Sequence, residues 1–288
     1  MIKNKLEKVC YLGDGNLDGA ASYLAGVMKH YKIDFDYIPS SESPNSDFLS
    51  KNYALYIVSD YSSGRFSNTE MDHIAESVKV HGSGLFMIGG WESFHGKNGE
   101  YHKSPLAEVL PVEMEKEDDR RNSSLPIILI RREPHPILWE LPWNWPACIA
   151  GYNKVKAKKD ATVLLEGITI DVRVLGEEVE DCLKIYNRQY EGKNIEEQAT
   201  VSLSTGDAIG FRPVKRDPIL VIGSYGKGRT AAYASDLAPH WSSGLIDWGQ
   251  PRITEEIGND SIEVGLWYSK FCRNLVQWCA QFPMDAKE

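Results

Sequence analysis

Cysteine is scarce in this chain of 288 residues, and long hydrophobic runs are missing. The five cysteines show none of the CxxC spacing that zinc sites use, and no other ligand spacing predicts a metal site. The first ten residues, MIKNKLEKVC, lack the apolar core of an export signal, so we expect a cytoplasmic protein with reduced thiols. No segment is apolar over the roughly 20 residues that span a bilayer, so we expect no membrane partner. The cysteines are Cys10, Cys148, Cys182, Cys272 and Cys279.

An excess of basic charge is missing too. The formal net charge is −9, whereas a general nucleic-acid binder needs a basic surface to neutralise phosphates. The short basic clusters at 120–121, 131–132 and 156–159 have acidic neighbours and are typical of a solvated surface. We therefore expect no nucleic-acid partner. The composition is that of a globular protein, and it leaves a small-molecule ligand and a homo-oligomer open.

A nucleotide-binding fingerprint is absent as well. The loop GDGNLDG at residues 13–19 approaches the G-x-G-x-x-G pattern, but its spacing is one residue too long. Two aspartates in this loop, Asp14 and Asp18, would also face the negative charge of a pyrophosphate. We expect no dinucleotide and no other cofactor.

The first half of the chain alternates between short apolar runs and helical patterns. Ser67 and Glu70 form a capping box, and the helix that they begin ends at Gly82. Short connections between alternating strands and helices indicate a parallel sheet with helices on both faces. The prediction is a flavodoxin-like, doubly wound, mostly parallel α/β sheet. Its strands are expected at 9–12, 35–38, 53–59 and 85–88, with a helix at 20–31.

The second half changes its pattern. Alternating polar and apolar residues from 168 to 216 predict a β-rich subdomain inserted into a single domain of residues 1–288. The core is expected to resume as a β-hairpin over 219–235, and a final helix is expected over 263–282. Three tryptophans and three prolines crowd the segment HPILWELPWNWP at 135–146, which we expect to line a cavity or an interface.

The stretch GSGLFMIGGWESFHG at residues 82–96 is the centre of the functional prediction. Its apolar first half is typical of a strand buried on both faces, and polar and aromatic residues follow directly. Ligands of open α/β sheets bind outside the carboxyl ends of the strands. We therefore expect a ligand site here, although a tight turn with aromatics that merely cover the sheet is the alternative. The expected ligand-binding residues are Gly89, Gly90, Trp91, Ser93 and His95.

Two other strand ends supply further candidates. Asp60 follows one predicted strand, while Asp236, His240 and Trp241 follow the C-terminal hairpin. We predict Glu92, Asp236 and His240 as catalytic acid/base groups, with Asp60 and Trp241 added to the ligand-binding set. Two carboxylates held close together should raise the pKa of one of them. Asp236 could instead cap the segment that follows it.

Three segments resemble a known family: IGGWESFHG (88–96), SPLAEVLPV (104–112) and GKGRTAAYASDLAPHW (226–241). Together they are similar to the glutamine-amidotransferase-like family of uncharacterised cytoplasmic proteins, which is related to trehalose-utilisation proteins and belongs to the class I glutamine amidotransferase superfamily. The resemblance covers about 10–167 and 219–282 and implies a flavodoxin-like α/β sandwich.

The resemblance breaks at the nucleophile. Class I amidotransferases carry a G-x-C-x-G elbow that exposes a thiol. In this chain Gly89 matches the first glycine, Trp91 stands at the cysteine and Ser93 replaces the second glycine. The superfamily's His-x-Glu pair is also missing, because the matching strand ends in Ala-Ser-Asp at 234–236. Cysteine-dependent glutamine hydrolysis is therefore not expected.

Two functions remain open. The first is a hydrolase- or isomerase-type acid/base enzyme that acts on a small polar, sugar-like molecule. The second is a non-catalytic module that binds a ligand or a partner protein. A single cavity shared by Glu92, Asp236 and His240 would favour the enzyme, and their separation would favour the binding module.

Overall fold

The computed structural model describes residues 7–175, 199–202 and 208–284. Its core is one ten-stranded sheet in the order β2-β1-β3-β4-β12-β11-β9-β6-β7, with β10 paired to β11. The first five strands of this order run parallel to one another. They are β2 (Phe35–Ile38), β1 (Val9–Gly13), β3 (Leu55–Ser59), β4 (Gly84–Ile88) and β12 (Gly228–Tyr233).

The parallel half has the flavodoxin-like strand order that the sequence predicts. Every residue of β1, β3 and β4 is buried, which explains why these strands are unbroken apolar runs without polar alternation. The C-terminal strand β12 takes the fifth position beside β4. The predicted doubly wound fold is therefore confirmed.

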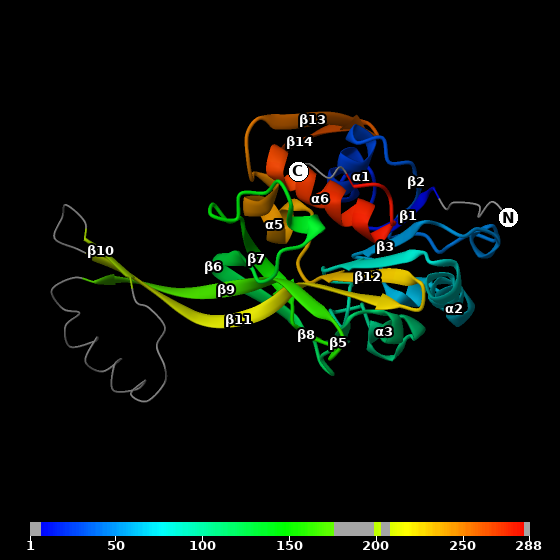
Figure 1. Ribbon diagram of the computed structural model, residues 1–288, viewed down its shortest axis with the longest axis horizontal. Helices are drawn as coiled ribbons and strands as arrows, with labels where there is room; N and C mark the ends of the chain where they lie inside the picture. The colour runs from blue at the N-terminus through cyan, green and yellow to red at the C-terminus, as the bar shows by residue number, and fades with distance from the viewer. Residues whose placement is uncertain (1–6, 176–198, 203–207, 285–288) are drawn as a thin grey trace.

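Helices cover both faces of the parallel half. In Figure 1, α1 (Ala21–His30) and α6 (Leu266–Cys279) lie on one face, and α2 (Asn68–Glu76) and α3 (Pro105–Val109) lie on the other. The capping box at the start of α2 is present in both directions. The helical segment after α2 ends at Gly82, whose φ of 84° is a left-handed conformation that favours glycine.

The other half of the sheet is antiparallel. Figure 1 shows β9 and β11 as long, bent strands that project together far beyond the parallel half. Register shifts near Pro213 and Pro218 interrupt their pairing. The strands are β11 (Ala208–Tyr225), β9 (Thr162–Leu175), β6 (Arg120–Arg131), β7 (Cys148–Asn153) and β10 (Ala199–Ser202).

The predicted β-rich subdomain at 168–216 stays a prediction. The described part of this range consists of the outer portions of β9 and β11 together with β10, all antiparallel. Residues 176–198 and 203–207, and Cys182 with them, lie outside the described residues. Within the described part, the same two strands also form the sheet core, so the range begins and ends inside core strands.

The final helix begins later than predicted. A second hairpin, β13 (Arg252–Ile257) with β14 (Asp260–Gly265), occupies the first residues assigned to that helix, and α6 starts only at Leu266. Ile262 and Val264 are buried while Glu263 between them is exposed, which is the two-residue period of a strand. A small pair, β5 (Val112–Met114) with β8 (Val155–Ala157), and helix α5 (Pro239–Ile246) complete the elements.

The tryptophan- and proline-rich segment packs against the end of α5. The Trp143 and Trp248 rings lie 5.3 Å apart, and the Trp248 indole donates to the Trp145 carbonyl at 2.8 Å. The Trp145 side chain itself is 73% exposed. This segment contributes no residue to the two cavities described below.

Candidate functional site

Four neighbouring parallel strands end at one edge of the sheet. Their register places the end of β1 beside the end of β3, β3 beside β4, and β4 beside β12. Asp14 directly follows β1, Asp60 directly follows β3, and Asp236 comes three residues after β12. The topology therefore gathers carboxylates from three separate loops at the edge where such sheets bind ligands.

These residues enclose a cavity of about 310 Å³. It combines three carboxylates with aromatic walls and contains no lysine or arginine among its lining residues. The lining residues are Asp14, Ala20, Asp60, Gly90, Trp91, Asp236, Ala238, Pro239, His240 and Trp241. Six of them are residues that the sequence singles out for the site, so much of the expected grouping is present.

Asp14 and Asp60 have unusual backbone conformations. Their φ angles are 57° and 42°, in the left-handed region that few residues other than glycine adopt, although Asp tolerates it better than most. The amide of Asp14 donates to the carbonyl of Ser59 at 2.6 Å, so the two strand ends are joined directly. The backbone turns sharply at both residues.

The three carboxylates are held close together in a dry site. Burial raises the pKa of Asp14 to about 7; repulsion from Asp60 adds to this rise, and the hydroxyls of Ser59 and Tyr11 offset part of it. Burial also raises the pKa of Asp60. Burial, followed by repulsion from Asp14, raises the pKa of Asp236 well above its usual value. The repelling carboxylates are thus the three aspartates together with Glu92, which adds to the rise in the Asp60 pKa.

A residue of the antiparallel half of the sheet holds the turn after β4 in place. Asn153, the last residue of β7, is fully buried; its Oδ1 accepts from the amide of Gly90 at 2.9 Å, and its Nδ2 donates to the Gly90 carbonyl at 3.0 Å. The same Nδ2 donates to Asp119 at 2.7 Å. Gly89 donates to the carbonyls of Tyr233 and Ser235. The predicted glycine pair therefore lies between β12 and Asn153, where a side chain has no room.

Trp91 and His240 form one wall of the cavity. Their ring centroids are 6.1 Å apart, and His240 stacks on Trp241 at 6.3 Å. The Arg120 guanidinium lies 4.4 Å from the centre of the Trp91 ring and also pairs with Asp118 at 2.6 Å. Trp91 is 43% exposed, so its indole can meet a ligand. Trp241 is buried, and the Asn122 side chain accepts its indole N–H at 2.8 Å.

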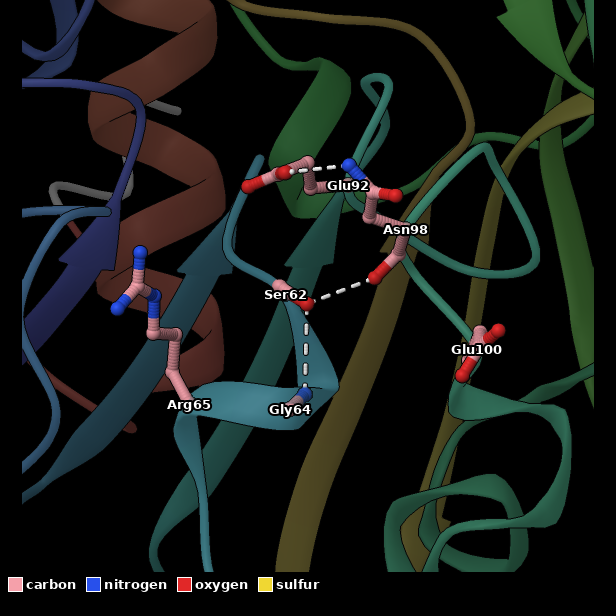
Figure 2. Close-up of a pocket in the computed structure, with 6 residues that line it drawn as sticks. All are labelled: Ser62, Gly64, Arg65, Glu92, Asn98 and Glu100. Carbon is pink, nitrogen blue, oxygen red and sulfur yellow. Dashed lines mark hydrogen bonds between the residues drawn. The ribbon is translucent and has the colours of Figure 1, made fainter.

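Glu92 does not join Asp236 and His240. Its amide donates to Asp60 Oδ1, whereas its carboxylate accepts from Asn98 at 2.9 Å. This carboxylate lines a neighbouring cavity of about 390 Å³, which Figure 2 shows. The other lining residues there are Ser62, Gly64, Arg65, Asn98 and Glu100. Trp91 and Glu92 are consecutive residues, yet the Trp91 side chain lines one cavity and the Glu92 side chain lines the other. Asp60 lies in the cavity with Asp236 and His240, where Glu92 was expected.

Ser93 and His95 contribute to structure around the site. Ser93 is fully buried, and its hydroxyl accepts from the amide of Asp60 at 3.0 Å, which helps to hold the turn after β3. The ring of His95 bonds the carbonyl of Glu115 at 2.7 Å and stacks on His102 at 3.8 Å. Neither side chain lines either cavity.

The described cysteines lie away from both cavities. Cys10, Cys272 and Cys279 are buried in the core, and burial raises the pKa of each thiol. Cys148 is partly buried on β7, and burial raises its pKa as well. A raised pKa keeps a thiol protonated and a poor nucleophile.

A comparison with family models identifies the chain. The model described as "Putative glutamine amidotransferase" matches residues 13–177 and 201–253. The chain belongs to this glutamine amidotransferase-like family. The match includes the ends of β1, β3, β4 and β12, so the cavity lies within the part of the chain that the family shares. A comparison with curated proteins finds no match.

Two solved structures support the family's fold. Both are of cytoplasmic proteins from Salmonella typhimurium, one of them from strain LT2, and each is 23% identical to this chain with a TM-score of 0.65. Each alignment covers 94% of this family member and 98% or 99% of the other chain. The likeness extends over nearly the whole length and shows a shared fold.

The described residues contain neither a membrane-spanning helix nor a metal-binding cluster. No helix there is long and apolar enough to cross a membrane. No three His, Cys, Asp or Glu residues in that part of the family member gather into a group that could hold a metal ion. The three aspartates of the cavity therefore surround a space without converging on a single point.

The sequence missed two residues of this site. Asp14 was weighed only against a nucleotide, although it follows a buried strand just as Asp60 does, and that position is the signal that identifies it. Asn153 ends an antiparallel strand far along the chain, and no local pattern marks it.

Proposed function

We propose that this protein binds a small polar, sugar-like metabolite in the strand-end cavity and acts on it by acid/base chemistry. The observation that carries the proposal is the meeting of Asp14, Asp60 and Asp236 with His240 and Trp91 around one cavity. A cavity with apolar walls and a few converging polar groups suits a small ligand. Carboxylates can accept hydrogen bonds from hydroxyls, and an indole can cover the apolar face of a sugar ring.

Asp14 and Asp236 are the proposed acid/base pair. Burial raises the pKa of Asp14 to about 7, so this carboxyl can take up or release a proton at neutral pH. The pKa of Asp236 is raised well above the usual value by burial, which favours the protonated form as a donor to a substrate oxygen. His240 stands beside them in the first turn of α5. A reaction of the hydrolase or isomerase type would use this pair.

The proposal excludes a cysteine nucleophile. Trp91 stands where the sequence pattern of amidotransferases has the thiol, and no cysteine lines either cavity. We propose that this family member lacks glutaminase activity and works without a cofactor, a nucleic acid or a membrane. We also propose a cytoplasmic location, as the names of the two Salmonella proteins state for those proteins. Light scattering would test whether it forms a homo-oligomer.

A non-catalytic binding module is the second candidate. It is favoured by one observation, the separation of the Glu92 carboxylate from Asp236 and His240. A module of this kind would use the same cavity and bind the ligand unchanged.

Conversion of metabolites by the purified protein distinguishes these functions. The protein is incubated with a panel of sugars and a cell extract, and products are followed by mass spectrometry. We expect conversion that Asp14→Asn and Asp236→Asn abolish and that Asp72→Asn, an exposed carboxylate on α2, leaves unchanged. Ligand binding without conversion would favour the binding module. Release of ammonia from glutamine, or loss of activity when the thiols are alkylated in a folded protein, would overturn the proposal.

A further inference from the structure

The carboxylates of the cavity have unused hydrogen-bonding capacity. The Ser59 hydroxyl donates to Asp14 Oδ2 at 3.4 Å, the backbone amide of Glu92 donates to Asp60 Oδ1, and the amide of Ala238 donates to Asp236 Oδ1 at 2.9 Å. The Tyr11 hydroxyl also favours the ionised form of Asp14, and the amides of Trp91 and Leu237 do the same for Asp60 and Asp236. Asp14 is 5% exposed and Asp236 is 8% exposed, so bulk water reaches little of either. A carboxylate offers about four acceptor sites, so all three can still accept hydrogen bonds from a ligand in the cavity.

The lining of the cavity is also rich in carboxyls and poor in basic groups. Three aspartates line it, and no lysine or arginine does. The nearest described guanidinium, that of Arg120, lies against Trp91 and is engaged by Asp118. Besides burial, Asp60 raises the pKa of Asp14, and both of them raise the pKa of Asp236, so these carboxyls repel one another when they are ionised. A ligand that brings positive charge would relieve this repulsion.

The arrangement suits an organic cation better than a metal ion. In the described part of the chain, no three potential ligands gather closely enough to hold a metal ion. An ammonium group on a hydroxylated frame could instead place its N–H donors and hydroxyls against carboxylates on different sides of the cavity. The indole of Trp91, with His240 at its edge, adds an aromatic face of the kind that attracts cations.

We propose that the ligand of this cavity carries a primary ammonium group on a polyhydroxylated frame, as an amino sugar does. This inference rests on the proposed function and names the class of its ligand. The ammonium binds between Asp14 and Asp236, and the hydroxyls reach Asp60 and His240. Trp91 covers the remaining face.

Calorimetric titration at pH 7 with three matched probes tests the inference. The probes are glucosamine, N-acetylglucosamine, which keeps the nitrogen without its charge, and glucose. We expect glucosamine to bind about tenfold more tightly than either neutral probe. Asp14→Asn and Asp236→Asn should each reduce that ratio towards one, while Asp72→Asn on α2 should keep it. Circular dichroism shows whether each variant is folded. If only one of the two cavity variants folds, that variant is enough for the test.

The possible outcomes separate this inference from the proposed function. Equal affinity of glucosamine and glucose, with both lost in Asp236→Asn, would overturn the ammonium inference and leave the cavity as a sugar site. A preference for glucosamine that neither cavity variant changes would also overturn it, because the cation would bind elsewhere. Failure of glucosamine to bind at tens of millimolar overturns it as well. The proposed acid/base reaction is judged separately by the conversion assay.

Discussion

The parallel and antiparallel halves of the sheet contribute different parts of the site. The parallel half supplies the chemical groups: Asp14, Asp60 and Asp236 follow three of its strands. The antiparallel half supplies their supports, since Asn153 ends β7, and Arg120 and Asn122 lie on β6. Among the described strands, the halves meet as neighbours at one boundary, where β12 pairs with β11.

This difference shows where stability and function oppose each other. The loops of the parallel half hold like charges together and keep two aspartates in left-handed conformations, both of which cost free energy of folding. Residues of the antiparallel half stabilise neighbouring loops of the parallel half: Asn153 is hydrogen-bonded to Gly90, and Asn122 to Trp241. Removing a support should therefore destabilise the protein, whereas removing a charge should stabilise it.

Removal of the Asn153 side chain should give the largest effect. Asn153→Ala leaves the amide and carbonyl of Gly90 unpaired and removes one hydrogen bond from the buried Asp119 carboxylate, which keeps the one from the amide of His95. We expect a loss of about 3 kcal/mol in the free energy of unfolding, measured by urea denaturation. Asn98→Ala removes an amide from an exposed loop and should cost less than about 0.5 kcal/mol. Similar losses for the two variants would refute the supporting role of β7.

A methyl group at Gly89 should have the next largest effect. A Cβ there would lie 2.2 Å from the Ala234 carbonyl oxygen and 2.7 Å from Asn153 Oδ1, so the backbone must move. Gly89→Ala should cost about 2 kcal/mol in thermal or urea unfolding. Gly64→Ala is the matched control, because a Cβ there would meet only Ser62 Oγ at 3.6 Å. If Gly89→Ala unfolds like the wild type, the close contact between the two strand ends is not needed.

The sequence predicted the parallel half well because its signals are local. Unbroken apolar runs identify β1, β3 and β4, and a capping box and a terminal glycine bound the helical segment between β3 and β4. Strand ends in such a sheet meet at one edge, so Asp60, Trp91, Asp236 and His240 could be grouped before the structure was known.

The remainder depends on contacts between distant residues. Glu92 was grouped with Asp236 because it follows β4 by a few residues. In this turn, however, the consecutive side chains of Trp91 and Glu92 line different cavities. Asn153 contacts Gly90 across 63 positions of the chain. The final helix was predicted to begin near Glu263, whereas residues 263–265 are the end of β14, because these residues lie directly beside a strongly helical segment. No local pattern carries information of this kind.

Removal of the Asp14 charge should stabilise the protein. The folded-state pKa of about 7 lies above the usual unfolded value near 4, so the folded state holds this proton more tightly. The stability that protonation provides is full below about pH 4 and is lost as the pH rises to about 7. Asp14→Asn should therefore raise the free energy of unfolding by about 1–3 kcal/mol at pH 8 and change it little at pH 4.

Urea denaturation between pH 4 and pH 8 measures this difference. Asparagine tolerates the left-handed φ of this position, so the backbone should stay unchanged. Asp72→Asn on α2 controls for the loss of an exposed carboxylate and should show no such pH dependence. A variant that is less stable than the wild type at pH 8 would mean that Asp14 has a favourable partner in the folded state.

The contact between Arg120 and Trp91 should give the smallest effect, and a double-mutant cycle can isolate it. Arg120→Gln removes the guanidinium that lies 4.4 Å from the ring centre, and Trp91→Leu removes the ring. Because Trp91 is partly exposed, we expect a coupling energy of about 0.5–1 kcal/mol from the two single variants and the double variant. Arg120→Gln also breaks the ion pair with Asp118, but that loss occurs in both arms of the cycle and cancels. Lys156→Gln, which breaks an exposed pair with Glu113 away from Trp91, should show no coupling to Trp91→Leu. A coupling energy of zero for Arg120 would mean that β6 places this cation beside the cavity without holding the indole, and the antiparallel half would then support the site through Asn153 and Asn122 alone.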